Sequence, residues 1–310
     1  MISILLLTLN GGERLREALT AIRAQQGAPP YEVLAIDSGS TDQTLDVVKA
    51  LADRVVTIPP AEFGHGRTRN LAARLAQGEW LVYLSQDAVP AGPGWLANLT
   101  RSLANPQVAA AFGRQLPPAD VGPIETFFLN YTYPSHPFEQ SRLRSVSGGI
   151  GRIFFSNVNA AIRKSVLLEN PFPDDVIMSE DQAFGRAALE AGYIVTYEPE
   201  AAVIHGHRYS LGQLFRRNFD SGYSLREISG DTWRNVVALG LGYIGAEVGH
   251  LWRSGRAGWI PYALLYEVTK SAGFASGRIG HRLPLTWRRA LSLHRRHWDR
   301  PEAARQGGPG

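Results

Sequence analysis

The sequence predicts an α/β fold, in which a mainly parallel sheet has helices on both faces, followed by a helical C-terminal region. Through about the first 115 residues, short apolar runs alternate with stretches in which apolar residues recur at helical spacing. Repeated strand–helix units with apolar strands are typical of a parallel sheet that is covered on both faces. We therefore divide the chain into a first domain, 1–210, and a helical, basic region, 211–310.

The individual elements follow from the same patterns. The expected strands are short and apolar and cover residues 2–7, 33–36, 54–58, 80–84, 153–155, 160–163 and 194–197. The expected helices cover residues 13–24, 40–52, 67–76, 94–103, 179–191 and 211–224. Two of these helices are predicted to open on capping boxes, Ser40 with Gln43 and Ser179 with Gln182. Residues 117–151 mix Pro, Gly, Ser and aromatic residues, and an irregular loop of that length is typical of a lid or a substrate surface.

The amino-acid composition excludes several classes of protein. Hydrophobic residues make up 44% of the chain and charged residues 19%, which fits a packed globular protein. There is no cysteine, which excludes disulfide scaffolds, thiolate zinc sites, iron–sulfur clusters and cysteine nucleophiles, and favours a reducing compartment. The apolar start of the sequence has neither a basic segment before it nor a small-residue cleavage site, so we expect a first strand and a cytoplasmic protein.

Charge is distributed unevenly along the chain. Residues 1–200 hold 16 Lys and Arg against 21 Asp and Glu, a net charge of −5, whereas residues 201–310 hold 16 against 7, a net charge of +9. A basic C-terminal part indicates a segment that faces an anionic surface. We do not expect nucleic acid as a partner.

Residues 236–275 are apolar but interrupted by charged residues. No run reaches the roughly 18–20 apolar residues that a membrane-spanning helix needs. Trp and Tyr residues accompany this stretch, and a cluster of arginines follows it, namely Arg288, Arg289, Arg295 and Arg296. Two interpretations stay open, an interfacial segment at the inner face of the cell membrane and a helical surface that packs in a homo-oligomer.

Polar residues stand where predicted strands end. Asp37 and Asp87 each come just after an apolar run, and ligands of such sheets bind beyond the carboxyl ends of the strands. Asp37 could accept a hydrogen bond from a nucleobase or ribose, and Asp87 could bind a divalent ion that bridges two phosphates. His205 and His207 point to the same side of an extended chain, so one or both could ligate a metal. Taken singly, each of these residues equally fits a structural role.

Two helix starts also carry functional side chains. Glu180 and Asp181 open one predicted helix, where one carboxylate could act as a general base or both could merely interact with the helix dipole. His65, Arg67 and Arg69 stand with flanking glycines at the start of another, and such a helix start can hold a diphosphate.

Together and in this order, the motifs resemble glycosyltransferase family 2, which has the GT-A fold, over about residues 1–210. The resemblance rests on Thr8-Leu-Asn10-Gly-Gly after the first strand, Asp37-Ser-Gly-Ser-Thr-Asp42, the strand-end Asp87 and the pair Glu180-Asp181. Within the family, four stretches resemble rhamnosyltransferases that use dTDP-L-rhamnose, and they cover residues 63–70, 85–88, 155–163 and 205–211.

The resemblance implies roles for individual residues. It implies a nucleotide-sugar site formed by Thr8, Asn10, Asp37, His65, Arg69, Asn70, Gln86 and Asp87. It also implies a divalent metal, Mg²⁺ or Mn²⁺, on Asp87 and His205, with Asp181 as the catalytic base and Glu180 as the second candidate. Ser85 departs from the family pattern, because it stands where the first Asp of an Asp-x-Asp motif usually lies and leaves the metal one carboxylate fewer.

The reaction implied is an inverting sugar transfer. The expected donor is dTDP-L-rhamnose, and the expected acceptor is a hydroxyl of a glycan or of a polyprenyl-linked glycan. One alternative is the same fold with a UDP- or GDP-sugar, and another is a catalytically inactive nucleotide-sugar-binding scaffold protein. The acids present at both the strand end and the helix start weigh against the scaffold.

Overall fold

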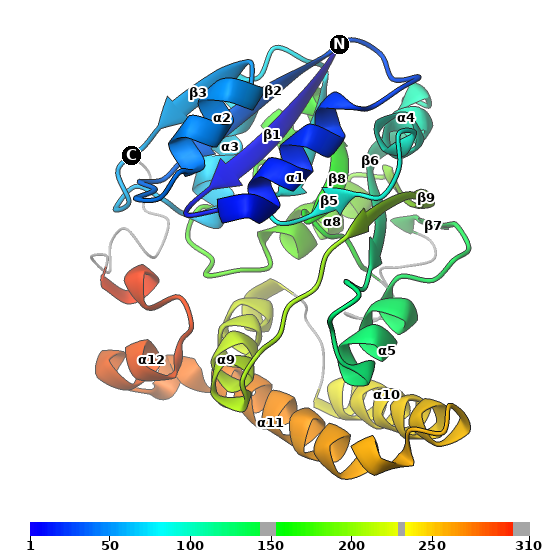
Figure 1. Ribbon diagram of the computed structural model, residues 1–310. Helices are drawn as coiled ribbons and strands as arrows, with labels where there is room; N and C mark the ends of the chain where they lie inside the picture. The colour runs from blue at the N-terminus through cyan, green and yellow to red at the C-terminus, as the bar shows by residue number, and fades with distance from the viewer. Residues whose placement is uncertain (143–152, 229–232, 300–310) are drawn as a thin grey trace.

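The structure, a computed structural model, describes residues 1–142, 153–228 and 233–299. A sheet with helices on both faces forms the upper part of Figure 1, and a layer of helices lies below it. The lower layer contains α5 (Pro123–Thr132) and the helices of the C-terminal region. This arrangement confirms the expected α/β fold with a C-terminal helical region.

The sheet combines a parallel half and a mixed half. Within the described residues its strand order is β3-β2-β1-β4-β8-β6-β9-β5, with β7 paired to β9. The strands are β1 (Ile2–Thr8), β2 (Tyr31–Asp37), β3 (Arg54–Thr57), β4 (Trp80–Ser85), β5 (Val89–Pro90), β6 (Val108–Leu116), β7 (Phe138–Gln140), β8 (Asn159–Arg163) and β9 (Ile194–Ile204). The first four strands in this order are parallel, whereas β8 runs antiparallel to β4 and β6. The carboxyl ends of β1, β2 and β4 therefore share one edge, where the residues after them become neighbours.

Apolar side chains alternate between two cores, one on each face of the sheet. In β1, Ile4 and Leu6 pack into one core and Leu5 into the other. Helices α1, α2 and α4 cover the first core, and α3, α7 and α8 cover the second. Their bounds are α1 (Gly12–Arg23), α2 (Thr44–Leu51), α3 (His65–Leu75), α4 (Trp95–Thr100), α7 (Lys164–Glu169) and α8 (Glu180–Glu190).

Neither predicted capping box forms, and one of the two predicted helix starts is wrong. Helix α2 begins at Thr44 rather than at residue 40, because Asp37 accepts hydrogen bonds from both the hydroxyl and the N–H of Ser40. Helix α8 begins where expected, but its Gln182 side chain donates to the carbonyl of Phe155 at 2.6 Å instead of closing a capping box. In both cases another contact takes the group that capping would use, a local one with Asp37 at Ser40 and one with Phe155 at Gln182.

Other differences lie between residues 104 and 170. The described part of the expected irregular region, residues 117–142, contains α5 and β7, while residues 143–151 lie outside the described residues. Residues 153–155 form no strand. Strand β6 and helix α7 were not anticipated, since β6 is rich in alanine, which has a weak strand preference.

The C-terminal helices pack closely on one another. They are α9 (Leu211–Ile228), α10 (Trp233–Arg253), α11 (Ile260–Arg278) and α12 (Leu285–Leu291). Glycines bring α9 and α11 together, because a Cβ atom at Gly222 or at Gly277 would lie 2.1 Å from a backbone carbonyl oxygen of the facing helix. Tight packing therefore explains these glycines of α9 and α11, whereas Gly240, Gly242 and Gly245 of α10 have no atom within 4 Å of the Cβ position.

The helices of the described residues, 1–142, 153–228 and 233–299, include none with the length and apolar character needed to cross a membrane. Helices α10 and α11 form the outer edge of the helical layer, on the side away from the sheet (Figure 1). Large apolar side chains are exposed there, including Trp252 at 71% and Val268 at 64%.

Candidate active site

Asp37 organises the loop after β2. Its buried carboxylate accepts the N–H groups of Gly39 and Ser40 at 3.0 and 2.9 Å, and the hydroxyls of Ser40 and Thr8 at 2.5 and 3.0 Å. Burial alone would raise the pKa of this carboxyl group, but the hydrogen bonds hold it below its usual value. Four donors fill the capacity of a carboxylate. Asp37 therefore holds the loop in place. Its neighbour Ser38 lines two cavities, of about 690 and 170 Å³, that are described below.

The loop after β1 is fixed by two amide side chains. Gln86 accepts the N–H of Leu9 at 2.9 Å and donates to its carbonyl oxygen at 3.1 Å. Asn10 accepts the N–H of Thr41 at 2.9 Å, and its own N–H donates to the Ser40 hydroxyl at 2.9 Å. The two side chains thus clamp three strand-end loops together, which positions Leu9 in the cavity wall.

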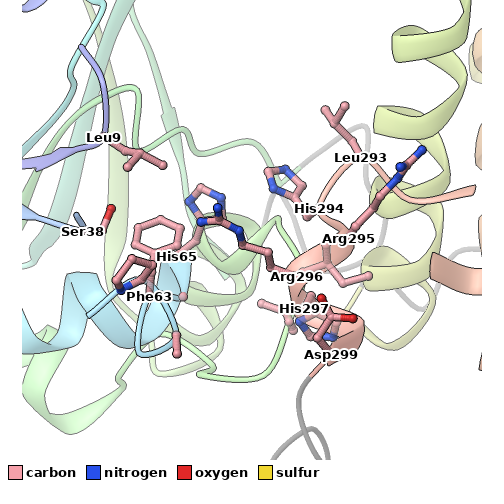
Figure 2. Close-up of a pocket in the computed structure, with 15 residues that line it drawn as sticks. Leu9, Ser38, Phe63, His65, Leu293, His294, Arg295, Arg296, His297 and Asp299 are labelled. Carbon is pink, nitrogen blue, oxygen red and sulfur yellow. The ribbon is translucent and has the colours of Figure 1, made fainter. Parts of the chain in front are cut away.

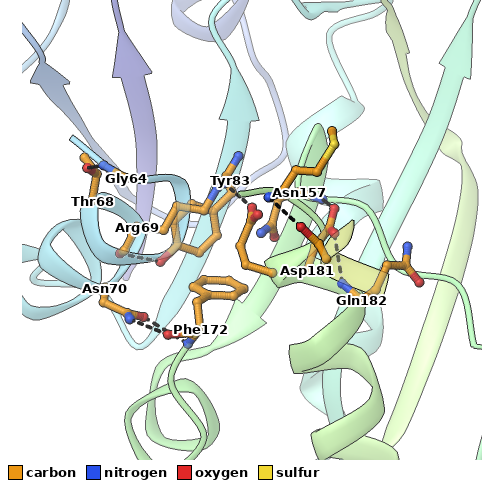
Figure 3. A network of polar contacts seen from close by, with 12 residues as sticks. Gly64, Thr68, Arg69, Asn70, Tyr83, Asn157, Phe172, Asp181 and Gln182 are labelled. Carbon is orange, nitrogen blue, oxygen red and sulfur yellow. Dashed lines mark hydrogen bonds and ion pairs between the residues drawn. The ribbon is translucent and has the colours of Figure 1, made fainter. Parts of the chain in front are cut away.

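Arg69 links the start of α3 to the start of α8. Its guanidinium forms an ion pair with Glu180, and the Tyr83 hydroxyl donates to the Arg69 carbonyl at 2.9 Å (Figure 3). Burial would raise the pKa of Glu180, but the charge of Arg69, followed by that of His65, holds it below its usual value. Glu180 is therefore kept ionised against Arg69 and does not line the cavity that Asp181 faces.

Asp181 lines a cavity of about 460 Å³. Its carboxylate accepts the N–H of Asn157 at 3.1 Å and the N–H of Gln182 at 2.8 Å (Figure 3). Burial, and then the charge of Glu180, raise the pKa of Asp181 to about 7. A carboxylate whose pKa lies near neutrality is suited to accept a proton from a hydroxyl group. The helix start thus separates two acids into different environments.

Asp87, His205 and His207 converge after β4 and β9. One possible ligand atom from each residue lies within 4.8 Å of the other two. His205 Nε2 is 3.5 Å from Asp87 Oδ1, and His207 Nδ1 is 3.7 Å from Asp87 Oδ2. Burial opposes ionisation of Asp87, but its interactions with His205, and then with His207, lower its pKa to about 2. Burial and the His205 charge lower the pKa of His207 to about 4, so this ring is neutral at pH 7.

A neighbouring amide sets the tautomer of His205. Gln115 directs its Nε2 group at the Tyr133 and Ser156 hydroxyls, which leaves its Oε1 atom to accept Nδ1–H of His205 at 2.8 Å. Nε2 of His205 then carries a lone pair, and it is buried with no hydrogen-bond partner in the described part of the chain. A carboxylate and two imidazole nitrogens, one of which is buried without a hydrogen-bond partner, together fit a divalent metal.

Three cavities run in series along the edge of the sheet. The first, of about 690 Å³, lies between Leu9, Ser38 and His65 and the segment 293–299 (Figure 2). It shares Leu9, Ser38, Phe63 and His65 with a second cavity of about 170 Å³, which reaches Asp87. A third cavity, of about 460 Å³, shares Asp87 with the second and contains Asp181.

The C-terminal helices form one wall of the third cavity. Arg217 from α9, Tyr243 from α10 and Lys270 from α11 line it opposite Asp181. Helix α5 adds Glu125, Phe128 and further residues to the same wall. The helical region is therefore part of this site, beyond the domain boundary expected at residue 210.

Comparison with known proteins shows the family to which this chain belongs. The glycosyl transferase family 2 profile matches residues 3–169, more than half of the 310-residue chain. The chain belongs to glycosyltransferase family 2. It is a glycosyltransferase, as the resemblance in its motifs implies.

Curated family 2 relatives are similar along almost the whole chain. The O-antigen chain rhamnosyltransferase RfbN of Salmonella typhimurium is 33% identical over 308 residues, 96% of each chain. The O-antigen chain rhamnosyltransferase WbaN of Salmonella anatum is 32% identical over 302 residues, 94% of each chain. The similarity therefore extends past residue 210 into the helical region.

Solved structures confirm the GT-A fold of this family 2 chain. TarS 1-349 of S. aureus in complex with UDP-GlcNAc matches with a TM-score of 0.57 and 17% identity, over 91% of each chain. The mannosyltransferase PcManGT from Pyrobaculum calidifontis, in complex with GDP-Man and Mn²⁺, matches with a TM-score of 0.55 and 19% identity. That match covers 96% of this chain and 85% of the other.

The structure brings most of the predicted family 2 site residues together, with Asn70 as the clear exception. Thr8, His65, Arg69, Gln86 and Asp87 line the second cavity. Asn70 lines none of the three cavities, and its expected role in nucleotide-sugar binding stays a prediction. Its buried amide group donates to the Phe172 carbonyl at 2.8 Å and to Asp174 at 2.9 Å, and accepts the N–H of Phe172 at 3.1 Å. The side chains of Asn10 and Asp37 likewise accept hydrogen bonds from backbone N–H groups of the loop after β2.

The site contains two further residues that are absent from the set implied by the resemblance. His207 joins Asp87 and His205, and the i, i+2 spacing of the two histidines is a signal for it in the sequence. Gln115 orients His205 from the unanticipated strand β6, and no local pattern points to it. His207 thus places a third possible ligand atom near the position where Ser85 replaces a carboxylate.

Proposed function

We propose that this glycosyltransferase transfers L-rhamnose from dTDP-L-rhamnose to a hydroxyl of a glycan or lipid-linked glycan acceptor, with inversion at the anomeric carbon. This proposal is supported by the sequence identity of 33% and 32%, over nearly the full length of the chain, to two proteins named O-antigen chain rhamnosyltransferases. The three cavities share lining residues. This supports a donor site that extends from the 690 Å³ cavity to Asp87 and an acceptor site in the 460 Å³ cavity.

Asp181 is the proposed general base. It lines the acceptor cavity, and its two backbone hydrogen bonds hold the carboxylate in one orientation. It takes the proton from the acceptor hydroxyl as the oxygen attacks the anomeric carbon and the bond from that carbon to the diphosphate breaks. Glu180 is proposed instead to hold Arg69 at the donor side, since the two form a buried ion pair.

Asp87, His205 and His207 are the proposed ligands of a divalent metal. When bound, such an ion neutralises the negative charge of the leaving nucleoside diphosphate. Two imidazole ligands favour Mn²⁺ over Mg²⁺, because Mg²⁺ prefers oxygen ligands. Gln115 keeps His205 in the tautomer that presents Nε2 to the ion.

The walls of the acceptor cavity fit a carbohydrate. They combine aromatic rings with hydrogen-bonding groups, among them Phe128, Phe154, Tyr209, Tyr243, Tyr266, Ser156 and Gln182. Sugar rings bind to such walls through apolar faces against aromatic rings and hydroxyl groups toward polar side chains. This composition favours a glycan acceptor.

The deciding experiment measures nucleoside diphosphate release with dTDP-rhamnose, UDP-sugars and GDP-sugars in turn. Each reaction contains Mn²⁺ and a polyprenyl-linked glycan acceptor, and binding of dTDP, UDP and GDP is measured in parallel. We expect acceptor-dependent release of dTDP. Release from another donor would replace rhamnose transfer by the alternative sugar, and binding without release from any donor would indicate the inactive scaffold.

The helical layer is also proposed to contact an anionic membrane surface. Its outer helical face consists of exposed apolar residues of α10, α11 and the turn between them, namely Val237, Leu239, Leu241, Trp252, Trp259, Tyr262, Leu264, Leu265 and Val268. Arg253 and Arg256 are exposed beside the two tryptophans. Exposed aromatic and apolar side chains next to arginines are complementary to an interface of anionic lipids.

The arginine cluster expected from the sequence is partly used inside the protein. Arg288 donates to the carbonyls of Leu283 and His281, and Arg289 forms an ion pair with Asp299. The test of membrane contact is therefore co-sedimentation with anionic and neutral vesicles at low and high salt, with Arg253→Gln/Arg256→Gln and Trp252→Ser. We expect salt-sensitive binding to anionic vesicles that both variants weaken. A protein that ignores these vesicles and elutes as a stable dimer would assign the outer helical face to a homo-oligomer.

A further inference from the structure

The 690 Å³ cavity is closed on one side by a segment far along the chain from the residues opposite it. This segment, residues 292–299, is called here the C-terminal segment. It contributes Leu293, His294 and Arg296 to the cavity, across from Phe63 and His65 at the start of α3 (Figure 2). The rings of His65 and His294 meet edge to face at 5.3 Å, so the two sides are in contact.

The C-terminal segment is anchored to α9. Asp220, which is fully buried in α9, accepts the N–H groups of Leu293 at 2.9 Å and His294 at 3.0 Å. Trp298 is 3% exposed and packs edge to face on Tyr223 at 5.0 Å. These contacts hold the segment as a fixed wall rather than as a loose chain end.

The cavity is continuous with the part of the site that reaches Asp87. The 690 Å³ and 170 Å³ cavities share four residues, and the smaller one also contains Asp87. A nucleoside diphosphate whose phosphates lie near Asp87 extends its nucleoside into the 690 Å³ cavity. This placement rests on the proposed function.

Arg296 and Arg295 are both exposed, but their side chains take different directions. Figure 2 shows the Arg296 side chain extending across the cavity toward Phe63 and His65, while Arg295 points away from them. We propose that the C-terminal segment forms the outer wall of the donor nucleotide site and that Arg296 binds the nucleoside diphosphate. Phe63 and His65 also line the smaller cavity that reaches Asp87, so a guanidinium that extends toward them faces the diphosphate end of the donor, where it supplies charge-assisted hydrogen bonds.

The test compares Arg296→Gln with Arg282→Gln, a control at an exposed arginine that lines none of the three cavities. Binding of dTDP, UDP and GDP is measured by calorimetry without acceptor. We expect Arg296→Gln to weaken the best-bound nucleotide about tenfold and to raise the donor KM with little change in kcat, whereas Arg282→Gln stays within about twofold of wild type. Equal affinity of wild type and Arg296→Gln, or equal losses in both variants, would overturn the proposal.

Limited proteolysis gives a second readout that does not depend on turnover. Trypsin cuts after exposed arginines, and a bound nucleotide is expected to slow cleavage after Arg295 and Arg296 several-fold. Cleavage after Arg256, which is exposed at the far end of the helical layer, is expected to stay unchanged. Equal cleavage at 295–296 with and without saturating nucleotide would contradict the wall. If UDP or GDP binds more tightly than dTDP, the proposed donor is wrong while the proposal for Arg296 still stands. The variants are then compared with the nucleotide that binds most tightly.

Discussion

Nε2 of His205 lies 3.5 Å from Oδ1 of Asp87, at the junction of two cavities. Asp87 follows β4 and His205 follows β9, two strands that are not neighbours in the sheet. Their approach, together with His207, provides one carboxylate and two imidazoles at the place where Ser85 removes a second carboxylate. Under the proposed function, this cluster takes the place of the Asp-x-Asp pair that the chain lacks.

Loss of a ligand should abolish metal binding. We expect Asp87→Ala to remove detectable Mn²⁺ binding in a titration of the full-length protein, and His207→Gln to weaken it by at least about tenfold. A matched control is Asp120→Ala, an exposed acid outside the cluster. Dependence of dTDP binding on EDTA should disappear in Asp87→Ala. Unchanged Mn²⁺ affinity in both ligand variants would show that the cluster holds no metal.

Gln115 should act on the metal through His205. Gln115→Leu removes the acceptor of Nδ1–H, so we expect metal affinity to fall about 10- to 100-fold while the fold is retained. Partial recovery in Gln115→Glu, which restores an acceptor, distinguishes orientation of the ring from a packing defect. Calorimetric Mn²⁺ titration of the two variants measures the difference. Equal affinities of Gln115→Leu and wild type would contradict the role.

The general base should be essential for turnover. We expect Asp181→Asn to lower kcat by about 10²- to 10⁴-fold with donor binding retained. Glu190→Gln lies on the exposed end of the same helix and serves as the control. Steady-state release of dTDP and the circular dichroism of each variant are the measurements. Near-normal turnover of a folded Asp181→Asn enzyme would move the base to another residue.

The raised pKa of Asp181 predicts opposite pH effects on rate and stability. Below pH 7 the carboxylate takes up a proton, so kcat/KM should fall about tenfold per pH unit. The unfolded chain releases this proton near pH 4, so between about pH 4 and 7 the folded state binds more protons and loses stability as the pH rises. Asp181→Asn should therefore raise the melting temperature more at pH 8 than at pH 5. An equal shift at both pH values would place the pKa of Asp181 in the normal range.

Asp37 should matter more for stability than its neighbours do. Asp37→Ala leaves the N–H groups of Gly39 and Ser40 without their acceptor, and we expect a loss of at least about 2 kcal/mol in urea unfolding at pH 7. Because the folded-state pKa of Asp37 is lowered, its contribution is present above about pH 4 and decreases as the pH falls through that region. The deficit of the variant should therefore be smaller at pH 3 than at pH 7.

Asp46→Ala, an exposed acid in the first turn of α2, is the control for Asp37→Ala, and its cost is expected to stay below about 1 kcal/mol. Similar losses for both variants at pH 7 would mean that the hydrogen bonds of Asp37 add nothing beyond the helix dipole effect.

The sequence by itself determined the order of β1 to β4 and of α1 to α4, and it placed acids at the strand ends. Apolar periodicity is a local signal, and the carboxyl ends of parallel strands meet at one edge, so Asp87 could be placed near a ligand before any contact was known. The His205–His207 spacing similarly indicated a shared direction.

Only the tertiary structure decided which of these side chains are available for chemistry. Asp37 and Asn70 are used by loops, and Glu180 by Arg69, through partners that lie up to 111 residues away. Asp220 seats the C-terminal segment against the start of α3 through two backbone N–H groups. Such contacts join distant parts of the chain and depend on packing geometry, which leaves no local pattern in the amino-acid sequence.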